Sequence, residues 1–215
     1  MTTDDLIRLV ILVVIFLGIA FPVHEFAHAY VAYRLGDGTA KLFGRLTLNP
    51  IVHFDPLGGV LLMVSALSST ILSGGGFIFG WAKPTPVNPS NLRDRRNGEF
   101  LVAIAGPASN LLMAIIGAIA WRAIGAFDIR VPFLFAQILF YFVTFNIALA
   151  IFNLIPVPPL DGSAILFRLV SPQTAWRLRP MLAQYGFMLV LVVILLGGSV
   201  LGRAIVGITQ LLLGS

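Results

Sequence analysis

Long apolar stretches separated by short polar loops run through almost the whole of this chain. Each stretch holds about 20 residues or more, the length that an α-helix needs to cross the hydrocarbon core of a bilayer. The segments that fit this description are residues 6–35, 57–80, 99–124, 131–155 and 182–212. The pattern predicts an all-α polytopic membrane protein, a single transmembrane domain over residues 1–215 built as a bundle of about five to six transmembrane helices.

Two of these segments allow a second interpretation. Residues 57–80 contain the runs SALSST and SGGGF, whose small residues suit either a closely packed span or a re-entrant break. Residues 182–212 are too long for one straight span and are interrupted by Gly197-Gly198. They predict either one long tilted helix or two shorter pieces. The side of the membrane that holds the N-terminus depends on which interpretation of residues 57–80 is right.

The hydrophobic period changes between the first two segments. From residue 40 to residue 48 the even positions are apolar or glycine, whereas the odd positions are mainly polar. A period of two residues is typical of a strand with one buried face. We therefore expect a short β-strand or hairpin near residues 39–48, ended by Asn49-Pro50.

The composition agrees with a chain that faces lipid. Hydrophobic residues make up 58% of the 215 residues, charged residues make up only 11%, and the mean hydropathy is +0.96. Soluble domains carry about 25% charged residues, so most of this surface does not face water. The composition predicts a multi-pass integral protein of the cell membrane.

The basic charge of the chain does not predict nucleic-acid binding. The formal net charge is +5, but the basic residues gather in short loops such as residues 83–98 and 157–180. Positive charge in such loops fixes the orientation of membrane proteins, and two predicted spans separate these loops, so both can lie in the cytoplasm. The chain has no cysteine, so any transition metal must be held by His, Asp or Glu.

The first apolar segment contains the sequence His24-Glu25-Phe26-Ala27-His28, an H-E-x-x-H motif. Residues i and i+4 share one face of a helix, so the two imidazoles can hold one metal ion. Glu25 is displaced around the helix from His24 and His28, but it can reach a water on that metal and act as a general base. Ionisable groups within a span are costly, which favours a functional site over buried structural residues.

A zinc site of this kind needs a third protein ligand. Asp161 lies in the sequence PPLDG on a proline-bent backbone that cannot be a plain span, although it is also suited to cap the helix that follows. His53 is the rival candidate, although a loop histidine at the membrane interface is the simpler interpretation of it. The residues alone leave both candidates open.

These motifs together resemble the site-2 protease family of intramembrane zinc metalloproteases. The resemblance rests on His24-Glu25-x-x-His28, on AGPASN at residues 105–110, and on Asn153, Pro156 and Leu160-Asp161-Gly162, in that order. It is closest to the small subgroup without PDZ or CBS domains. The chain differs from the usual Asn-Pro-Asp-Gly form by reading Pro-Leu-Asp-Gly at residues 159–162, which keeps the carboxylate and the glycine.

The resemblance implies a function and a set of site residues. It implies one Zn²⁺ ion held by His24, His28 and Asp161, Glu25 as the catalytic base, and Asn153 or Asn110 as substrate-binding residues. The implied substrate is a transmembrane protein helix. Separately, the strand expected at residues 39–48 suggests that the unwound substrate backbone gains new hydrogen-bond partners there, although a structural hairpin that covers the bundle is the simpler interpretation. A homo-oligomer is compatible with a bundle of this size.

Two other functions fit the same residues less well. A membrane metal-binding protein or transporter would use the same His/Asp cluster, but transport predicts polar groups at several depths and gives Glu25 no role. An inactive relative that only binds membrane helices would have no need of Glu25. The sequence therefore favours an intramembrane metalloprotease.

Overall fold

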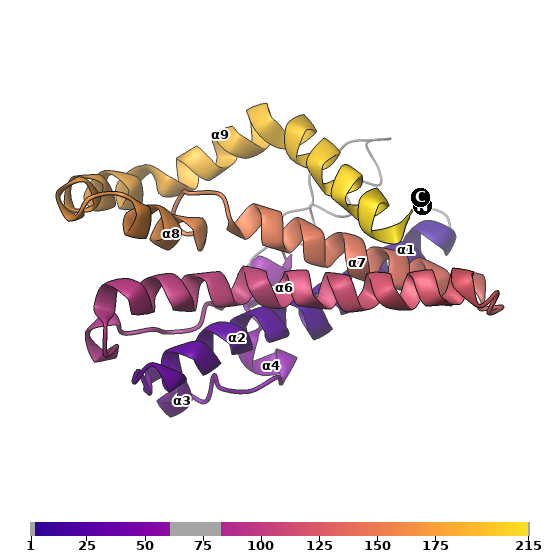
Figure 1. Cartoon of the computed structure of the whole chain (residues 1–215), viewed down its shortest axis with the longest axis horizontal. Helices are drawn as coiled ribbons and strands as arrows, with labels where there is room; N and C mark the ends of the chain where they lie inside the picture. Colours follow the sequence, from indigo (N-terminus) through magenta and orange to yellow (C-terminus); the bar gives the residue numbers. More distant parts are fainter. Residues whose placement is uncertain (1–2, 61–82, 215) are drawn as a thin grey trace.

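Helices account for the regular secondary structure of residues 3–60 and 83–214, which are the residues that our computed structural model of the chain describes. Figure 1 shows the long helices lying roughly side by side along the long axis of the molecule. The predicted all-α fold is confirmed for these two parts of the chain.

The first apolar segment forms one rod of three consecutive pieces: α1 (Thr3–Ile15), the π-helical turn η1 (Phe16–Ala20) and α2 (Phe21–Arg34). Pro22 lies in the first turn of α2, directly after η1, so the N–H that it lacks is a missing donor within the rod. The N–H of Phe21 donates to the carbonyl of Phe16, five residues earlier, so η1 holds one extra residue in its turn. That extra residue rotates α2 about its axis and decides which of its side chains face the rest of the bundle.

The prediction of a strand or hairpin near residues 39–48 is wrong. Thr39–Leu42 forms a single helical turn, α3, and the next regular element is another single turn, α4 (Pro50–His53). Leu42 and Phe43 should lie on opposite faces of a strand, yet their exposed fractions are 87% and 70%. The alternation therefore does not separate a buried face from an exposed one, and Gly44 turns the chain with a φ of 68°.

The carboxylate of Asp37 explains why a helical turn starts here. It accepts the N–H of Thr39 at 3.0 Å and the Thr39 hydroxyl at 2.5 Å, and its other oxygen accepts the N–H of Asn88 at 2.7 Å. Burial alone would raise the pKa of Asp37, but these hydrogen bonds and one from Asn91 outweigh it and hold the pKa below its ordinary value. Asp37 thereby ties the end of α2 to the loop that precedes α6.

The remaining elements are η2 (Pro89–Asn91), α6 (Arg95–Ala126), α7 (Phe133–Asn153), α8 (Gly162–Leu169) and α9 (Pro172–Leu213). The side chains of Asp94 and Ser171 cap α6 and α9, each by accepting an N–H from the third residue that follows. Helix α9 is one continuous helix of 42 residues that changes direction along its length (Figure 1). Residues 182–212 therefore belong to one long helix.

Four of the described helical stretches are long and apolar enough to cross a membrane: residues 10–34, 95–126, 133–153 and 172–213. They overlap four of the predicted segments, and the last helix begins ten residues before the predicted start at residue 182. Most of the predicted segment 57–80 lies outside the described residues. The total of five to six helices, and the choice between a span and a re-entrant segment, therefore stay predictions.

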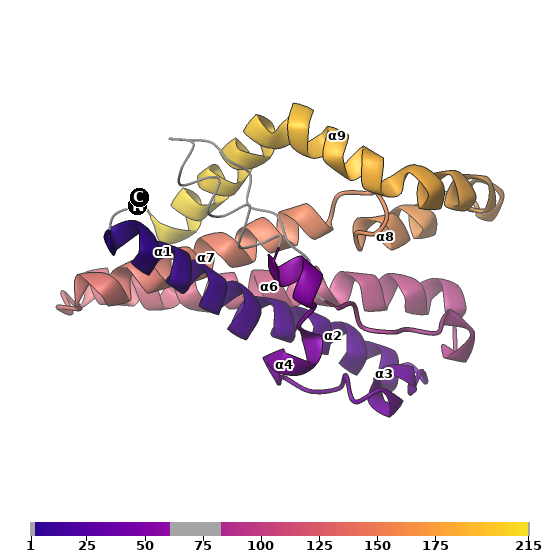
Figure 2. The ribbon, with the colours of Figure 1, turned by 180° about the vertical axis from the view of Figure 1, so that it is seen from behind.

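Helix α6 is the hub of the bundle, because it contacts α2, α7, α8 and α9. Figure 2, seen from behind, shows α1 and α2 crossing in front of α6 and α7. One buried cluster joins α6, α7 and the end of α9; its members are Ala114, Ala118, Val143, Ile147 and Leu213. The guanidinium of Arg122 also donates to the carbonyls of Leu211 and Leu212, so the last turn of α9 is anchored to α6.

Candidate metal centre

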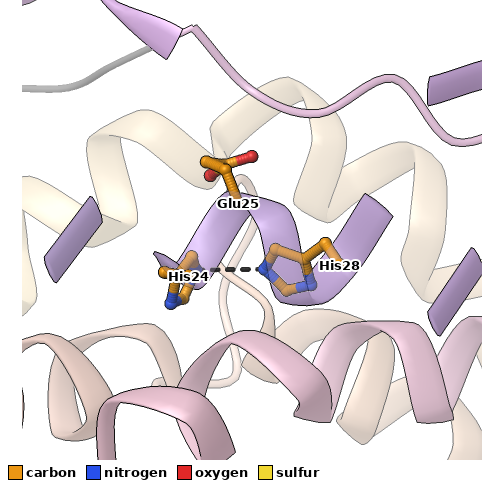
Figure 3. Close-up of side chains that lie close together, drawn as sticks. All are labelled: His24, Glu25 and His28. Carbon is orange, nitrogen blue, oxygen red and sulfur yellow. Dashed lines mark hydrogen bonds between the residues drawn. The ribbon is translucent and has the colours of Figure 1, made fainter. Parts of the chain in front are cut away.

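Helix α2 directs His24 and His28 to the same side, towards α6. Their exposed fractions are 3% and 7%, and their Nε2 atoms are 3.0 Å apart. Figure 3 shows the two rings projecting from one face of α2 with this contact between them. The spacing of four residues produces this pair, as the sequence predicted.

Asp161 comes from the loop between α7 and α8, and it completes the group. Its Oδ2 lies 3.2 Å from Nε2 of His24 and 3.3 Å from Nε2 of His28. This buried oxygen receives no hydrogen bond from the described residues. We call these three atoms the ligand triangle.

The ligand triangle has the dimensions of a zinc site. Zinc binds nitrogen and oxygen ligands at about 2.0–2.1 Å in a tetrahedral arrangement, which places any two ligand atoms about 3.3 Å apart. The three measured separations run from 3.0 to 3.3 Å. The residues present therefore fit one zinc ion, with a fourth position open.

The outer nitrogens of both rings are held by hydrogen bonds that leave the inner nitrogens free. Nδ1 of His28 lies 2.7 Å from the carbonyl of Val102, and a carbonyl can only accept, so Nδ1 carries the proton. Nδ1 of His24 lies 2.6 Å from Oδ1 of Asn110. When these rings are neutral, Nε2 is therefore the unprotonated atom that a metal requires.

A chain of amides fixes the orientation of Asn110. Its Nδ2 donates to Oδ1 of Asn146 at 3.0 Å and to the carbonyl of Ala20 at 3.3 Å. Asn146 in turn donates to the carbonyl of Phe142 at 2.9 Å. Because both donors of Asn110 point away from the ring, its carbonyl oxygen must face His24.

Gly106 makes room for the rings. A Cβ atom at this position of α6 would lie 2.6 Å from Nε2 of His24 and would also collide with Nε2 of His28. Both approaches are shorter than any van der Waals contact. The glycine of AGPASN thus allows α6 to pass directly against the ligand triangle.

Glu25 stands beside the ligand triangle rather than in it. The ligand atoms of His24, Glu25 and His28 all lie within 4.8 Å of one another, but Figure 3 shows the carboxylate pointing away from the two rings. Its Oε2 accepts the N–H of Thr85 at 2.7 Å, and the Thr85 hydroxyl donates to the Glu25 carbonyl at 3.1 Å. The segment before η2 therefore holds the glutamate in place.

A cavity of about 920 Å³ opens onto the site. It is lined by α2, α6, α7, α9 and the loop of Asp161, and its walls are mainly apolar. Glu25 and all three residues of the ligand triangle face it, as does Asn153, whose side chain donates to the carbonyl of Leu149 at 3.0 Å. Asn110 is fully buried and is not among the residues that line the cavity.

His53 is engaged elsewhere. In the described residues its Nε2 donates to the carbonyl of Thr47 at 2.9 Å, whereas Asp161 occupies the third place beside the two rings. The site also contains three residues that the sequence pattern did not predict as site residues: Gly106, Asn146 and Thr85. Asn146 could have been suspected, because a lone Asn in an apolar helix often bonds to a neighbouring helix.

Comparison with known proteins identifies a family and several relatives of this chain. The model of the family described as Peptidase family M50 matches residues 12–136 and 130–197. A Bacillus subtilis protein named "Putative zinc metalloprotease YwhC" is 42% identical over 194 residues, which cover 87% of this chain and 83% of that protein.

Two proteins with the same description, both named Rip2, are more distant. The one from Mycolicibacterium smegmatis is 31% identical over 172 residues, covering 80% of this chain and 62% of that protein. The one from Mycobacterium tuberculosis is 32% identical over 165 residues, covering 75% of this chain and 58% of that protein. This chain thus spans less than two thirds of either Rip2 protein, and no solved structure matches it.

Proposed function

Because the chain belongs to peptidase family M50, the site-2 protease family, we propose that it is an intramembrane zinc metalloprotease that cleaves transmembrane-helix substrates. The observation that carries the proposal is the ligand triangle, whose three atoms lie within 3.3 Å of one another. Its place inside a bundle of apolar helices supports a multi-pass protein of the cell membrane as the setting. The lipid bilayer and membrane proteins are its expected partners.

His24, His28 and Asp161 would hold one zinc ion. When bound, zinc lowers the pKa of water and polarises a peptide carbonyl. The protein's own contribution is to keep the ligands in the right protonation state. Asn110 and the carbonyl of Val102 keep the proton on Nδ1 of each ring, which leaves Nε2 for the metal.

Glu25 is the proposed general base. It takes a proton from the water whose oxygen bonds to the scissile carbonyl carbon, and it passes that proton to the nitrogen as the C–N bond breaks. The hydrogen bond from Thr85 engages only Oε2. Oε1 is therefore the oxygen proposed to carry the proton.

The apolar cavity supports a membrane-embedded substrate. Its lining favours an apolar segment, which must unwind locally because a helix hides its amides in hydrogen bonds. We propose that Asn153 binds the substrate backbone: its amide donates to Leu149, which leaves Oδ1 to accept an N–H. For Asn110 the geometry supports a role in positioning His24 instead of substrate binding.

Glu25→Gln tests the function. The variant should lose turnover by about a hundredfold or more, because general-base catalysis contributes that much. It should keep its zinc, because Glu25 is not a ligand in this proposal. Turnover is measured on a transmembrane substrate in detergent or liposomes, and zinc by metal analysis of the purified protein.

Zinc analysis of His24→Ala and Asp161→Ala provides the control. Both should lose zinc, since each removes one of three protein ligands. Zinc content equal to that of wild type in both would refute the proposed site. A Glu25→Gln variant with normal cleavage would refute the base, and altered ion flux with no wild-type cleavage would favour a transporter.

A further inference from the structure

We propose that Arg179 and Glu99 form a charged subsite that selects substrates with an acidic side chain about three residues from the scissile bond. This inference rests on the proposed function and adds a substrate preference to it. Both side chains line the same cavity as the ligand triangle. Apart from the site residues themselves, they are the charged residues in the described lining of that cavity.

Helix α6 sets the distance between this charged subsite and the ligand triangle. Glu99 and Gly106 are seven residues apart on α6, and Gly106 lies against both imidazoles. Seven residues of α-helix rise about 10 Å, and an extended chain covers about 3.3 Å per residue. A substrate segment that lies extended along α6 from the ligand triangle therefore reaches Glu99 after about three residues.

The ion pair is arranged so that Arg179 can change partner. Its guanidinium lies 2.5 Å from Oε2 of Glu99, while Oε1 of Glu99 is 3.2 Å from Nε of Arg95. If a substrate carboxylate pairs with Arg179 in place of Glu99, Glu99 remains paired with Arg95. No buried charge is left unpaired by the exchange, so its cost is small. Arg179 is also half-exposed, with its guanidinium over the ring of Phe167.

The surroundings favour an anion over a cation. Arg96 donates to the carbonyls of Arg168 and Val170, and Arg168 donates to the side-chain oxygen of Asn97. These partners are neutral. Asp94 is the acidic residue that interacts electrostatically with Arg168, so one of the two positive charges is offset and the other remains. The end of the cavity that holds Arg179 therefore carries an excess of positive charge, which attracts a carboxylate.

Away from Arg179 and Glu99, the cavity lining includes apolar side chains. Phe16, Phe145 and Ile205 line it there, and all three are apolar. A substrate with an acidic residue at one end of an apolar segment therefore fits the cavity in one direction. The subsite thus fixes the direction of the substrate as well as the preferred residue.

A charge-reversal experiment tests the subsite. The probes are synthetic transmembrane peptides with one Asp, or one Lys, moved stepwise along the sequence, and the cleaved bonds are mapped by mass spectrometry. Wild type should cleave about three residues from the Asp and prefer Asp to Lys by about tenfold in kcat/KM. Arg179→Glu should invert that preference, and Arg179→Gln should abolish it, with zinc content unchanged in both.

The control is Arg177→Glu, which makes the same change of charge two residues away on α9 at a residue that does not line the cavity. It should keep the wild-type preference for Asp. The proposal is overturned if Arg179→Gln lowers the cleavage of Asp and Lys peptides by the same factor, or if wild type does not distinguish them. Wild type that holds zinc but cleaves none of these peptides would instead contradict the proposed function.

Discussion

Gly106 shows how little space separates the two imidazoles from helix α6. The ideal position of a Cβ atom here is 2.6 Å from Nε2 of His24, so even alanine cannot fit without displacing a ring. The sequence pattern does not explain why residue 106 must be glycine, beyond its place in AGPASN. The close approach of α6 to the two imidazoles joins segments that are far apart in the chain. The same holds for Thr85, whose link to Glu25 spans 60 residues.

We expect Gly106→Ala to lower zinc affinity by about ten- to hundredfold, the range typical of damage to groups around a metal site. The physical reason is that the new methyl group pushes the rings out of the ligand triangle. The measurement is a competition titration with a zinc chelator. Gly125→Ala is the matched control on the same helix, because a Cβ there meets nothing within 4 Å; zinc binding as tight in Gly106→Ala as in this control would contradict the argument.

At the scale of elements, Gly186 couples α9 to the loop that carries Asp161. A Cβ at Gly186 would collide with the carbonyl oxygen of Pro158 and lie 3.0 Å from its carbonyl carbon. Both are backbone atoms, which cannot turn aside as a flexible side chain can. Pro158 is three residues before Asp161, so the position of α9 and that of the proposed third ligand are linked.

Gly186→Ala should therefore lower zinc affinity by about tenfold although the residue is not a ligand. The mutation separates α9 from the loop and moves Asp161 away from the two rings. Gly207→Ala on the same helix introduces the same methyl group where nothing lies within 4 Å. If both variants bind zinc as wild type does, the coupling is absent.

The elements also show which sequence patterns were informative. The apolar lengths and the i, i+4 histidines predicted the described spans and the ring pair, because both patterns are set within one helix. The prediction of a strand at residues 39–48 was wrong because the alternating apolar and polar residues do not alternate between buried and exposed positions. Asp37 and Gly44 instead impose turns on this segment. Asp161 could be placed beside His24 only through the resemblance to a family, since its distance from the rings depends on how α2, α6 and α8 pack.

At the scale of the whole molecule, the proposed zinc ion would bridge α2 and the loop between α7 and α8. A ligand that binds only the folded state stabilises it by about 2.7 kcal/mol when its free concentration is a hundred times the Kd. We expect zinc removal to lower the unfolding temperature of the wild-type protein in detergent. The measurement is a thermal melt with and without excess chelator.

Asp161→Ala separates this effect from general effects of the chelator. The variant keeps the bundle but lacks the third ligand, so its unfolding temperature should respond much less to chelator than that of wild type. Equal shifts in the two proteins would mean that the chelator acts elsewhere. No shift in wild type would mean that the ion does not bridge the helices.

The three proposed ligands lie far apart in the chain, since more than half of its residues separate His28 from Asp161. During synthesis, the two histidines enter the membrane long before the ribosome has made the aspartate. A chain that ends before residue 161 thus lacks one of the three proposed zinc ligands. Under the proposed function, proteolytic activity would therefore begin only once the packing of the bundle has brought Asp161 beside the two histidines.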